Sequence, residues 1–282
     1  MDIKSSMMKG IAALVLCAVV SLSAGAQTIS VKGSDTMLAL GQGWAAGYMK
    51  AKPGRTVTVT GGGSTTGIAG LVNGICDIAQ ASRIMRGSEL DRAKVRGFVP
   101  KEFPVARDGL AIIVNPRNPL NSISMEQLKG IFNGSISNWK QVGGPDQAII
   151  AVGRDSSSGT YGFFQDRVLG IGRPYRSDMQ TSPSTNAIAQ VVSQDAGAIG
   201  YVGVAYAKAF GSKVKILPVS SGGGAPVEPT EENVRNGKYP LWRYLFMYTR
   251  GNPTGAVKDF IDWVRGPEGQ AIVTQVGYYP IK

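Results

Sequence analysis

The sequence predicts an α/β fold, because short apolar runs alternate with amphipathic stretches along its 282 residues. Segment 56–60 alternates apolar and polar residues with the period of a half-buried strand. Three continuous apolar runs, at 110–114, 149–152 and 198–202, are typical of buried strands. Strands that alternate with helices in this way define the α/β class.

Helical patterns begin just after polar residues that cap helices well. Apolar residues recur with helical spacing at 37–48, 68–75 and 161–168, each time after a turn rich in Gly, Ser or Thr. A fourth start at Ser124 has Gln127 at the capping-box position. We expect a helix at each of these four places.

The N-terminus has the features of a secretory signal peptide. Two lysines precede an apolar run at 11–22, and residues 24–26 read Ala-Gly-Ala, as at a cleavage site. We therefore expect residues 1–26 to be removed and the protein to be periplasmic. A lipid anchor at Cys17 is not expected, because Leu16 is too bulky for the residue that precedes a lipidated cysteine.

The composition excludes several classes of function. The sequence contains no histidine, which removes a Ser-His-Asp triad and every zinc site with a histidine ligand. The formal net charge of +11 suits small anions, but the basic residues are scattered, so we do not expect nucleic-acid binding. Beyond the signal peptide Cys76 is the only cysteine, and a buried, unreactive thiol is the favoured interpretation. We expect no metal, cofactor or catalytic residue.

The most informative stretch is Arg154–Thr160, which reads Arg-Asp-Ser-Ser-Ser-Gly-Thr. Hydroxyls donate hydrogen bonds, glycine lets the backbone approach closely, and arginine supplies a planar, permanently charged fork. These groups together can hold an oxyanion. An ordinary capped loop would carry many of the same residues, so the stretch alone leaves both interpretations open.

Two further turns follow predicted strands. Gly61–Ser64 lacks the lysine of a nucleotide-binding P-loop and the spacing of a dinucleotide-binding turn, so Ser64 is either a helix cap or an anion ligand. Asp35 can likewise be a plain helix cap, and Arg83 a surface residue or the mouth of a pocket. If the polar turns converge at the carboxyl ends of their strands, they surround one anion.

Four segments, taken in order, closely resemble the phosphate-binding protein of bacterial ABC phosphate-uptake systems. They are Gly33–Met37, Gly62–Gly67, Asp77–Arg83 and Arg154–Thr160. Segments 128–134 and 198–202 also resemble that family. One such motif is weak, but the ordered set is specific, and the resemblance covers essentially the whole chain after the signal peptide.

The resemblance implies the fold of a type II periplasmic binding protein. Such a protein has two α/β domains joined by two hinge strands, with the ligand in the cleft. Segments Glu102–Asn115 and Pro240–Thr249 are similar to the two crossings. Domain I is then expected at 27–105 plus 245–282, and domain II at 106–244.

The resemblance also implies which residues contact phosphate. By motif they are Asp35, Thr36, Ser64, Arg154, Ser158, Gly159 and Thr160, with Ser34, Ser82 and Arg83 as adjacent candidates. One position departs from the best-known members of the family, in which an aspartate follows Ala-Ser and accepts the phosphate proton. Arg83 stands there in this chain and cannot accept a hydrogen bond. Our hypothesis is that Asp35 accepts the proton and that Arg83 adds positive charge.

The function that the resemblance implies is capture of inorganic phosphate for an ABC transporter. A monomeric binding protein would deliver the anion to a membrane permease and its ATPase. One alternative is a receptor of the same fold for sulfate, molybdate or tungstate. Another is a histidine-free serine hydrolase or phosphatase with Ser158 as nucleophile, although none of the four motifs contains a lysine that could act as its base.

Overall fold

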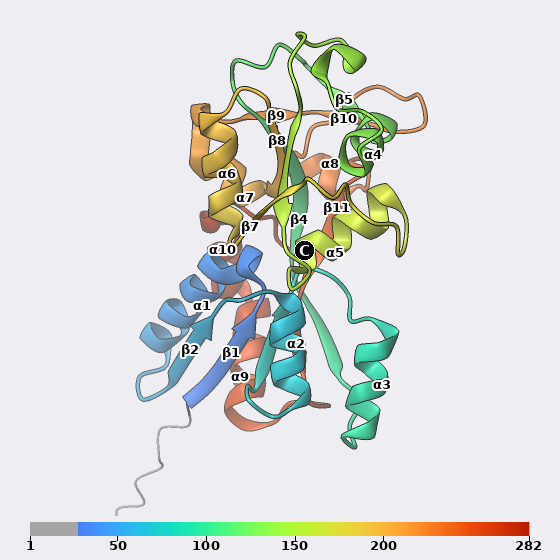
Figure 1. Ribbon diagram of the computed structural model, residues 1–282. Helices are drawn as coiled ribbons and strands as arrows, with labels where there is room; N and C mark the ends of the chain where they lie inside the picture. Colours follow the sequence, from blue (N-terminus) through green and yellow to red (C-terminus); the bar gives the residue numbers. More distant parts are fainter. Residues whose placement is uncertain (1–27, 282) are drawn as a thin grey trace, which may run out of the picture.

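The computed structural model describes residues 28–281, which form two lobes joined by two long strands (Figure 1). The predicted signal peptide, 1–26, lies outside the described residues. Within 28–281, no helix combines the length and the apolar character that crossing a membrane requires. Each lobe is a sheet with helices on both faces, so the predicted α/β class is confirmed.

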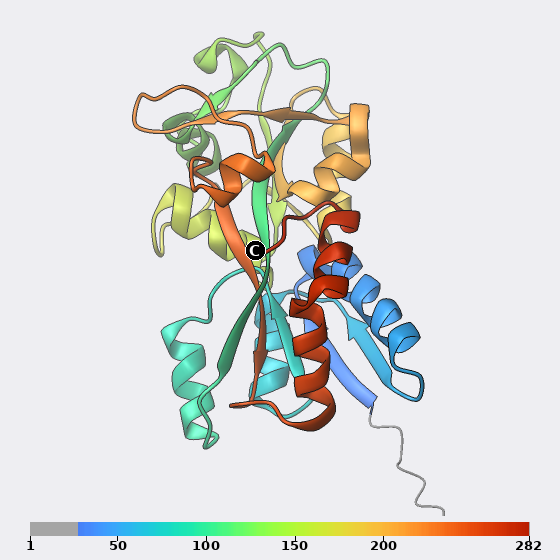
Figure 2. The ribbon, with the colours of Figure 1, turned by 180° about the vertical axis from the view of Figure 1, so that it is seen from behind.

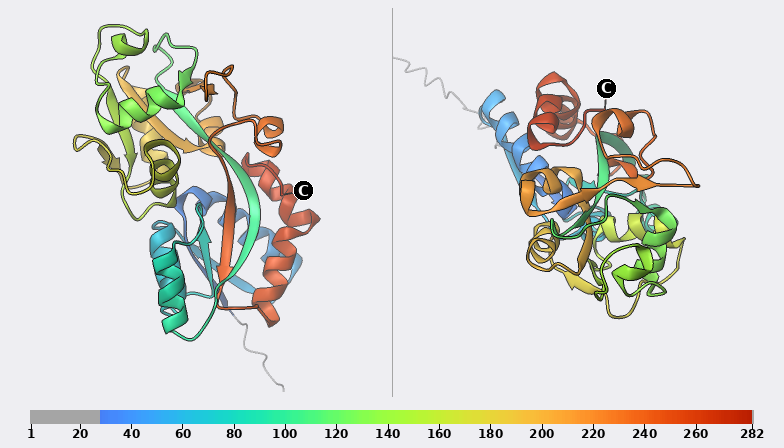
Figure 3. Two further views of the ribbon diagram at one scale, coloured as in Figure 1. Left: turned by 90° about the vertical axis from the view of Figure 1, so that its right-hand side faces the viewer. Right: turned by 90° about the horizontal axis from the view of Figure 1, so that it is seen from above.

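Lobe I contains a sheet with the strand order β2-β1-β3-β11-β4. Strand β1 is parallel to β2 and β3, whereas β11 is antiparallel to β3 and β4. Helices α1, α9 and α10 cover one face, and α2 and α3 cover the other (Figure 3). The elements that belong to lobe I alone are β1 (Thr28–Gly33), α1 (Leu38–Ala51), β2 (Thr56–Thr60), α2 (Ser64–Val72), β3 (Ile78–Ala81), α3 (Gly87–Val95), α9 (Gly255–Arg265) and α10 (Pro267–Val276).

The apolar face of α1 joins the beginning of the chain to its end. Leu40, Trp44 and Tyr48 are all buried, as their helical spacing predicts. The indole of Trp44 donates a hydrogen bond of 2.8 Å to the Gly269 carbonyl in α10. The ring of Tyr48 packs edge-on against Phe260 of α9, with 5.1 Å between centroids. Lobe I is therefore assembled from two distant parts of the sequence.

Lobe II contains the continuation of β4, with β9 on one side and β8-β6-β7 on the other. Helices α6 and α7 pack on one face of this sheet, and α4 and α5 pack on the other. The elements that belong to lobe II alone are β5 (Ile123–Ser124), α4 (Met125–Asn133), β6 (Ile150–Arg154), α5 (Gly159–Phe164), β7 (Gln180–Ser182), α6 (Thr185–Gln194), β8 (Ala198–Gly203), α7 (Val204–Phe210), β9 (Lys215–Leu217), β10 (Val219–Ser220) and α8 (Glu231–Arg235).

The predicted buried runs at 110–114 and 198–202 lie in β4 and β8, and the run at 149–152 begins one residue before β6. The predicted capping box is also present, because the Ser124 hydroxyl accepts from the Gln127 amide at 3.1 Å. The helix expected over 161–168 is less regular. Helix α5 ends after six residues and passes directly into one π-helical turn.

The helix expected over 68–75 ends earlier than its apolar spacing indicates. Gly74 adopts a φ of +72°, which turns the chain out of the helix after Val72. Ile75 is consequently 70% exposed instead of lying on the buried face. Cys76 is buried as predicted, and burial raises the pKa of its thiol to about 11, so the thiol stays protonated at neutral pH.

Two strands connect the lobes, β4 (Lys101–Val114) and β11 (Trp242–Thr249), close to the predicted crossings (Figure 2). They pair antiparallel along the whole of β11. The register shifts between Leu245 and Phe246, so that Val105 is the extra residue of a β-bulge. The bulge lies where the sheet of lobe I gives way to that of lobe II.

Candidate anion-binding site

Three polar turns of lobe I meet at one edge of its sheet. Because β1, β2 and β3 are parallel, their carboxyl ends lie together, and the segments that follow them converge there. The Ser34 amide donates to the Gln80 carbonyl at 2.8 Å, and the Ser82 amide donates to the Ser64 hydroxyl at 3.1 Å. The convergence that the sequence left open is therefore present.

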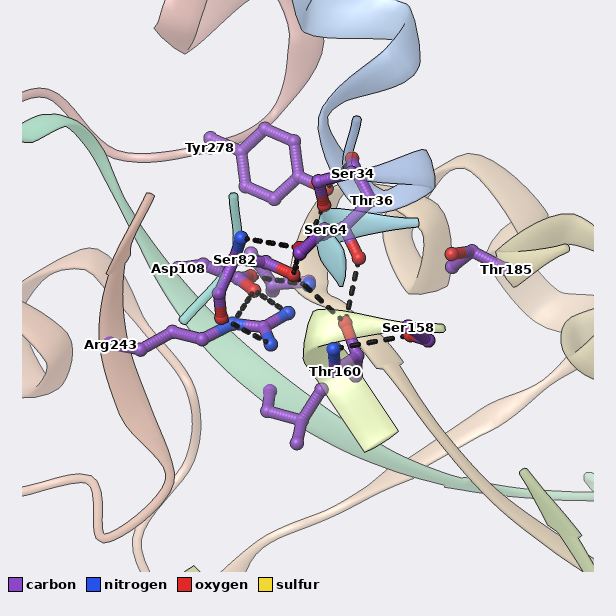
Figure 4. Close-up of polar contacts among 12 residues, drawn as sticks. Ser34, Thr36, Ser64, Ser82, Asp108, Ser158, Thr160, Thr185, Arg243 and Tyr278 are labelled. Atoms are coloured by element: carbon purple, nitrogen blue, oxygen red, sulfur yellow. Dashed lines mark hydrogen bonds and ion pairs between the residues drawn. The ribbon is translucent and has the colours of Figure 1, made fainter. Parts of the chain in front are cut away.

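Buried hydroxyls from both lobes form a cluster at this edge (Figure 4). The Ser34 hydroxyl donates to that of Ser82 at 3.0 Å, and Ser64 and Thr160 each lie 3.4 Å from the same oxygen. The hydroxyls of Thr36 and Thr160 are 2.7 Å apart across the two lobes. All five residues are buried, so the cluster is shielded from solvent.

Glycine is required where α5 of lobe II meets this cluster. A Cβ on Gly159 would stand 2.2 Å from the Ser64 hydroxyl and 2.8 Å from the Ser82 hydroxyl. Any larger residue would therefore hold the lobes apart. Ser158, just before it, caps α5 by accepting from the Thr160 amide at 3.1 Å.

The loop between β6 and α5 is fixed by Asp155. Its carboxylate accepts from the Ser157 amide at 2.8 Å. Burial alone would raise the pKa of Asp155, but the hydrogen bonds from Ser157 and the charge of Arg154 outweigh it and hold the pKa below its ordinary value. The carboxylate therefore stays ionised and keeps the loop in place at neutral pH.

Arg154 and Asp35 form a charge pair between the lobes. The Arg154 Nη1 lies 3.0 Å from Asp35 Oδ2, and the Thr185 amide of lobe II donates to the same oxygen at 2.7 Å. The guanidinium is 2% exposed, and its Nε has no hydrogen-bond partner within residues 28–281. A buried N–H donor without a partner is costly in a folded protein, so this Nε has a hydrogen bond that it could still donate.

Arg83 is engaged elsewhere. Its two terminal nitrogens donate to the two carboxylate oxygens of Glu89, both at 2.8 Å, and one also donates to the Thr65 hydroxyl at 3.0 Å. Glu89 also accepts from the Arg86 amide in the capping box of α3. The sequence analysis expected Arg83 to add positive charge to the site. That expectation stays a prediction, and in the structure Glu89 neutralises much of the Arg83 charge.

Sequence reasoning missed a second buried pair behind the cluster. Asp108 of β4 and Arg243 of β11 lie opposite each other in the strand register, and two guanidinium nitrogens donate to Asp108 Oδ2 at 2.9 and 2.7 Å. The third nitrogen donates to the Ser82 carbonyl at 3.0 Å and so positions that loop. The available signal was one acidic and one basic residue within the two predicted crossings.

Tyrosines also hold the first turn in place. The Tyr206 hydroxyl of lobe II donates to the Asp35 carbonyl at 2.9 Å, and the Tyr278 hydroxyl donates to the Thr36 carbonyl at 2.8 Å. Nine of the ten predicted residues thus gather around the cleft: Ser34, Asp35, Thr36, Ser64, Ser82, Arg154, Ser158, Gly159 and Thr160. The described residues contain no group of three or more acidic or cysteine side chains that could hold a metal ion.

Two lobes on two crossing strands, with a buried polar site between them, define the class of cleft-forming binding proteins. The model of the PBP superfamily domain matches residues 19–268. The phosphate-binding protein PstS of Bacillus subtilis is 35% identical over 90% of this chain and 81% of its own length. The PstS of Borreliella burgdorferi is 34% identical over 90% of each.

Solved structures agree with these relatives. One is a Clostridium perfringens substrate-binding protein of a phosphate ABC transporter, with bound phosphate. It is 31% identical, has a TM-score of 0.82, and is aligned over 91% of this chain and 100% of its own. A phosphate transport receptor from Vibrio cholerae is 30% identical, with a TM-score of 0.73 and coverage of 89% and 99%. The chain belongs to the PBP superfamily and, within it, to the family of the phosphate-binding protein PstS.

Proposed function

We propose that this protein captures inorganic phosphate between its lobes and delivers it to the permease and ATPase of an ABC transporter. The observation that carries the proposal is the buried hydroxyl cluster beside Arg154, whose Nε has no partner within 28–281. The Bacillus subtilis relative is named a phosphate-binding protein, and phosphate is bound in the Clostridium perfringens structure.

The proposed site holds the anion mainly with neutral donors. Each hydroxyl of the cluster can rotate from its neighbour toward phosphate, because a hydroxyl has one hydrogen and two lone pairs. The charge of Arg154 is shared with Asp35, which lies 3.0 Å away. Donors that are fixed in place before binding cost little reorganisation when the ligand arrives. The hydroxyl cluster and Arg154 would thus replace the hydration shell of phosphate.

Asp35 is the proposed acceptor for the proton of hydrogen phosphate. Within 28–281, both hydrogen bonds to its carboxylate reach Oδ2, from Arg154 and from the Thr185 amide. The lone pairs of Oδ1 remain to accept the proton. Sulfate has no such proton, so its oxygens would face these lone pairs without a hydrogen bond. Sites of this kind discriminate between close analogues by about 10⁴-fold or more.

The test is competition binding with phosphate and sulfate to the Asp35→Asn protein. We expect both anions to bind more weakly than to the wild type, because the pair with Arg154 is lost, and the preference for phosphate to collapse. Asp77→Asn is the matched control, because the Asp77 carboxylate accepts from Ser30 at 2.8 Å and has a structural role. An unchanged phosphate-to-sulfate ratio in Asp35→Asn would disprove the role of Asp35.

The choice of phosphate over other oxyanions has its own test. A bound ligand raises the melting temperature in proportion to the logarithm of its concentration over its Kd. Phosphate should therefore give the largest stabilisation in a panel with sulfate, molybdate and tungstate. A larger shift with one of the other three would assign the site to that anion.

The remaining parts of the proposal concern the whole protein. It acts without catalysis, because the Ser158 hydroxyl caps α5 and accepts from the Thr160 and Tyr161 amides. It works as a monomer in the periplasm after loss of residues 1–26. Its domain boundaries lie at 105/106 and 244/245, beside the β-bulge. Absence of turnover of a phosphate ester tests the first statement, and mass spectrometry of the exported protein tests the loss of residues 1–26.

A further inference from the structure

A large pocket lies between the lobes, beside the hinge strand β11. Its volume is about 840 Å³, within the roughly 300–1,000 Å³ of small-molecule sites. Segment 83–88 of lobe I, segment 163–172 of lobe II and residues 242–246 of β11 line it. The mechanism proposed above does not use this space, which we call the hinge pocket.

The floor of the hinge pocket is aromatic. Trp242, Tyr244 and Phe246 alternate along β11, so they project from the same face of the strand. Their ring centroids are 5.4 and 6.1 Å apart in succession. Phe163 of lobe II adds a fourth ring, over which the Arg243 guanidinium lies at 5.2 Å. Successive rings are inclined to one another by 81° and 60°, so the wall offers ring edges as well as faces to an apolar molecule.

Apolar side chains also stand at both edges of the pocket. Ile84 of lobe I is 64% exposed, and Ile171 of lobe II is 87% exposed. Isolated exposed isoleucines are common, but here one from each lobe borders the same apolar space. Apolar surface gathered in this way marks a ligand or partner site. A molecule in the pocket would cover both side chains.

The charges around the pocket favour an anion. Arg83 and Arg243 also line it, but carboxylates neutralise both. Arg86 and Arg167 line it too, and neither forms an ion pair within 28–281. Asp166 is the one carboxylate among the lining residues. Two unpaired guanidinium groups against one carboxylate leave a net positive charge beside an apolar wall.

We propose that the hinge pocket binds a small amphipathic organic anion. Its apolar body lies against the rings of β11, and its carboxylate, sulfonate or phosphate group lies beside Arg86 and Arg167. Direct binding does not depend on the function proposed above. Coupling to phosphate rests on that function. Because both lobes supply the walls, a ligand here favours the arrangement of the lobes in which they meet, and phosphate favours the same arrangement.

The first experiment uses two fluorescent probes of similar shape, 8-anilino-1-naphthalenesulfonate and the uncharged N-phenyl-1-naphthylamine. We expect saturable binding of one probe per protein, with the sulfonate about tenfold tighter because it gains a charge-assisted hydrogen bond. Arg167→Gln should weaken the sulfonate toward the affinity of the uncharged probe and leave the latter unchanged. Equal affinities of the two probes for the wild type would overturn the assignment to an anion.

Matched variants locate the site. Ile171→Asp places a negative charge at the edge of the pocket and should weaken the sulfonate about tenfold or more. Val95→Asp is the control. The Val95 side chain on α3 is 87% exposed, as Ile171 is, but it does not line the pocket. It should leave binding unchanged. Because both side chains are exposed, neither variant is expected to unfold the protein. The same response in both variants would overturn the proposal.

The coupling is measured by repeating the sulfonate titration in saturating phosphate. We expect tighter sulfonate binding, and phosphate affinity should rise by the same factor when the sulfonate saturates. An unchanged sulfonate affinity would overturn the coupling. A protein that binds the sulfonate at Ile171 but does not bind phosphate would refute the proposed function and leave the hinge pocket standing. A protein that binds phosphate but neither probe would refute the hinge-pocket proposal and leave the proposed function standing.

Discussion

Arg154 and Arg83 are both buried and both contact a carboxylate, yet they donate different numbers of hydrogen bonds. Arg83 donates two parallel hydrogen bonds of 2.8 Å to Glu89 and a third to Thr65. Arg154 reaches Asp35 with one nitrogen only, and its Nε has no partner within 28–281. Burial alone therefore does not distinguish the two arginines, whereas the number of hydrogen bonds that each donates does.

The two pairs also differ in what they join. Arg83 and Glu89 belong to lobe I, so their pair holds the β3–α3 connection whatever the position of the other lobe. Arg154 and Asp35 come from different lobes, so their pair requires the lobes to meet. We therefore expect changes at the first pair to alter stability and changes at the second pair to alter ligand affinity.

The largest effect on phosphate affinity is expected from Arg154→Gln. Loss of a buried, charged donor at an interface costs about 2 kcal/mol or more, so phosphate affinity should fall at least about thirtyfold. Isothermal titration calorimetry measures the change, and the exposed Arg92→Gln is the control. A loss of less than about threefold would mean that Arg154 does not face the anion.

Arg83→Met should lower stability instead of affinity. The change leaves Glu89 buried and unpaired, which costs about 3 kcal/mol of unfolding free energy. Urea unfolding should detect this loss, and the double variant Arg83→Met, Glu89→Leu should recover most of it, because a buried pair can be replaced by apolar groups. Phosphate affinity should stay within about threefold of the wild type. A loss of affinity as large as that of Arg154→Gln would erase the contrast between the two arginines.

Tyr206→Phe tests the weaker link between the lobes. It removes the hydrogen bond of 2.9 Å to the Asp35 carbonyl, which is worth about 1 kcal/mol, so phosphate should bind about fivefold more weakly. Tyr239→Phe is the matched control, because its hydroxyl donates to the Leu110 carbonyl and lies outside the cleft. If both variants weaken phosphate equally, the bond between the lobes has no special role.

The smallest expected effect is the acid sensitivity of Glu89. Burial would raise its pKa, but the hydrogen bonds and charges of Arg83 and Arg86 outweigh it, so the pKa in the folded state is lowered. Its contribution to stability is therefore present above the unfolded pKa of about 4.3 and is lost as the pH falls through the folded pKa. Urea midpoints measured from pH 6 to pH 3 should fall less steeply in Glu89→Gln than in the wild type. Equal slopes would show that folding does not lower the pKa of Glu89.

The hydroxyls of the cluster could be picked out from the sequence because each is adjacent to a local signal. Ser64 begins α2, Ser158 caps α5, and Ser82 follows β3. The partners of the charges could not be predicted in the same way. Asp108 and Arg243 are 135 positions apart, and the Thr185 amide lies 150 positions from Asp35. Only the folded chain determines which of these groups meet.

The fold could be predicted wherever an apolar pattern extended over many residues. The buried face of α1 and the runs in β4 and β8 agree with their patterns. Short signals failed where one backbone angle decides the outcome, as at Gly74, which ends α2 and exposes Ile75. The hinge pocket had no local signal at all, since its walls come from three separate segments.

The position of β11 within lobe I has a consequence for how the protein is made. This strand lies between β3 and β4 in the sheet, yet it is synthesised after the whole of lobe II. Until Thr249 has left the ribosome, the sheet of lobe I therefore lacks the strand between β3 and β4. The Trp44 indole also lacks its hydrogen-bond acceptor, the Gly269 carbonyl. Contacts this distant in sequence form slowly. The sheet of lobe I is therefore completed only after lobe II has been synthesised.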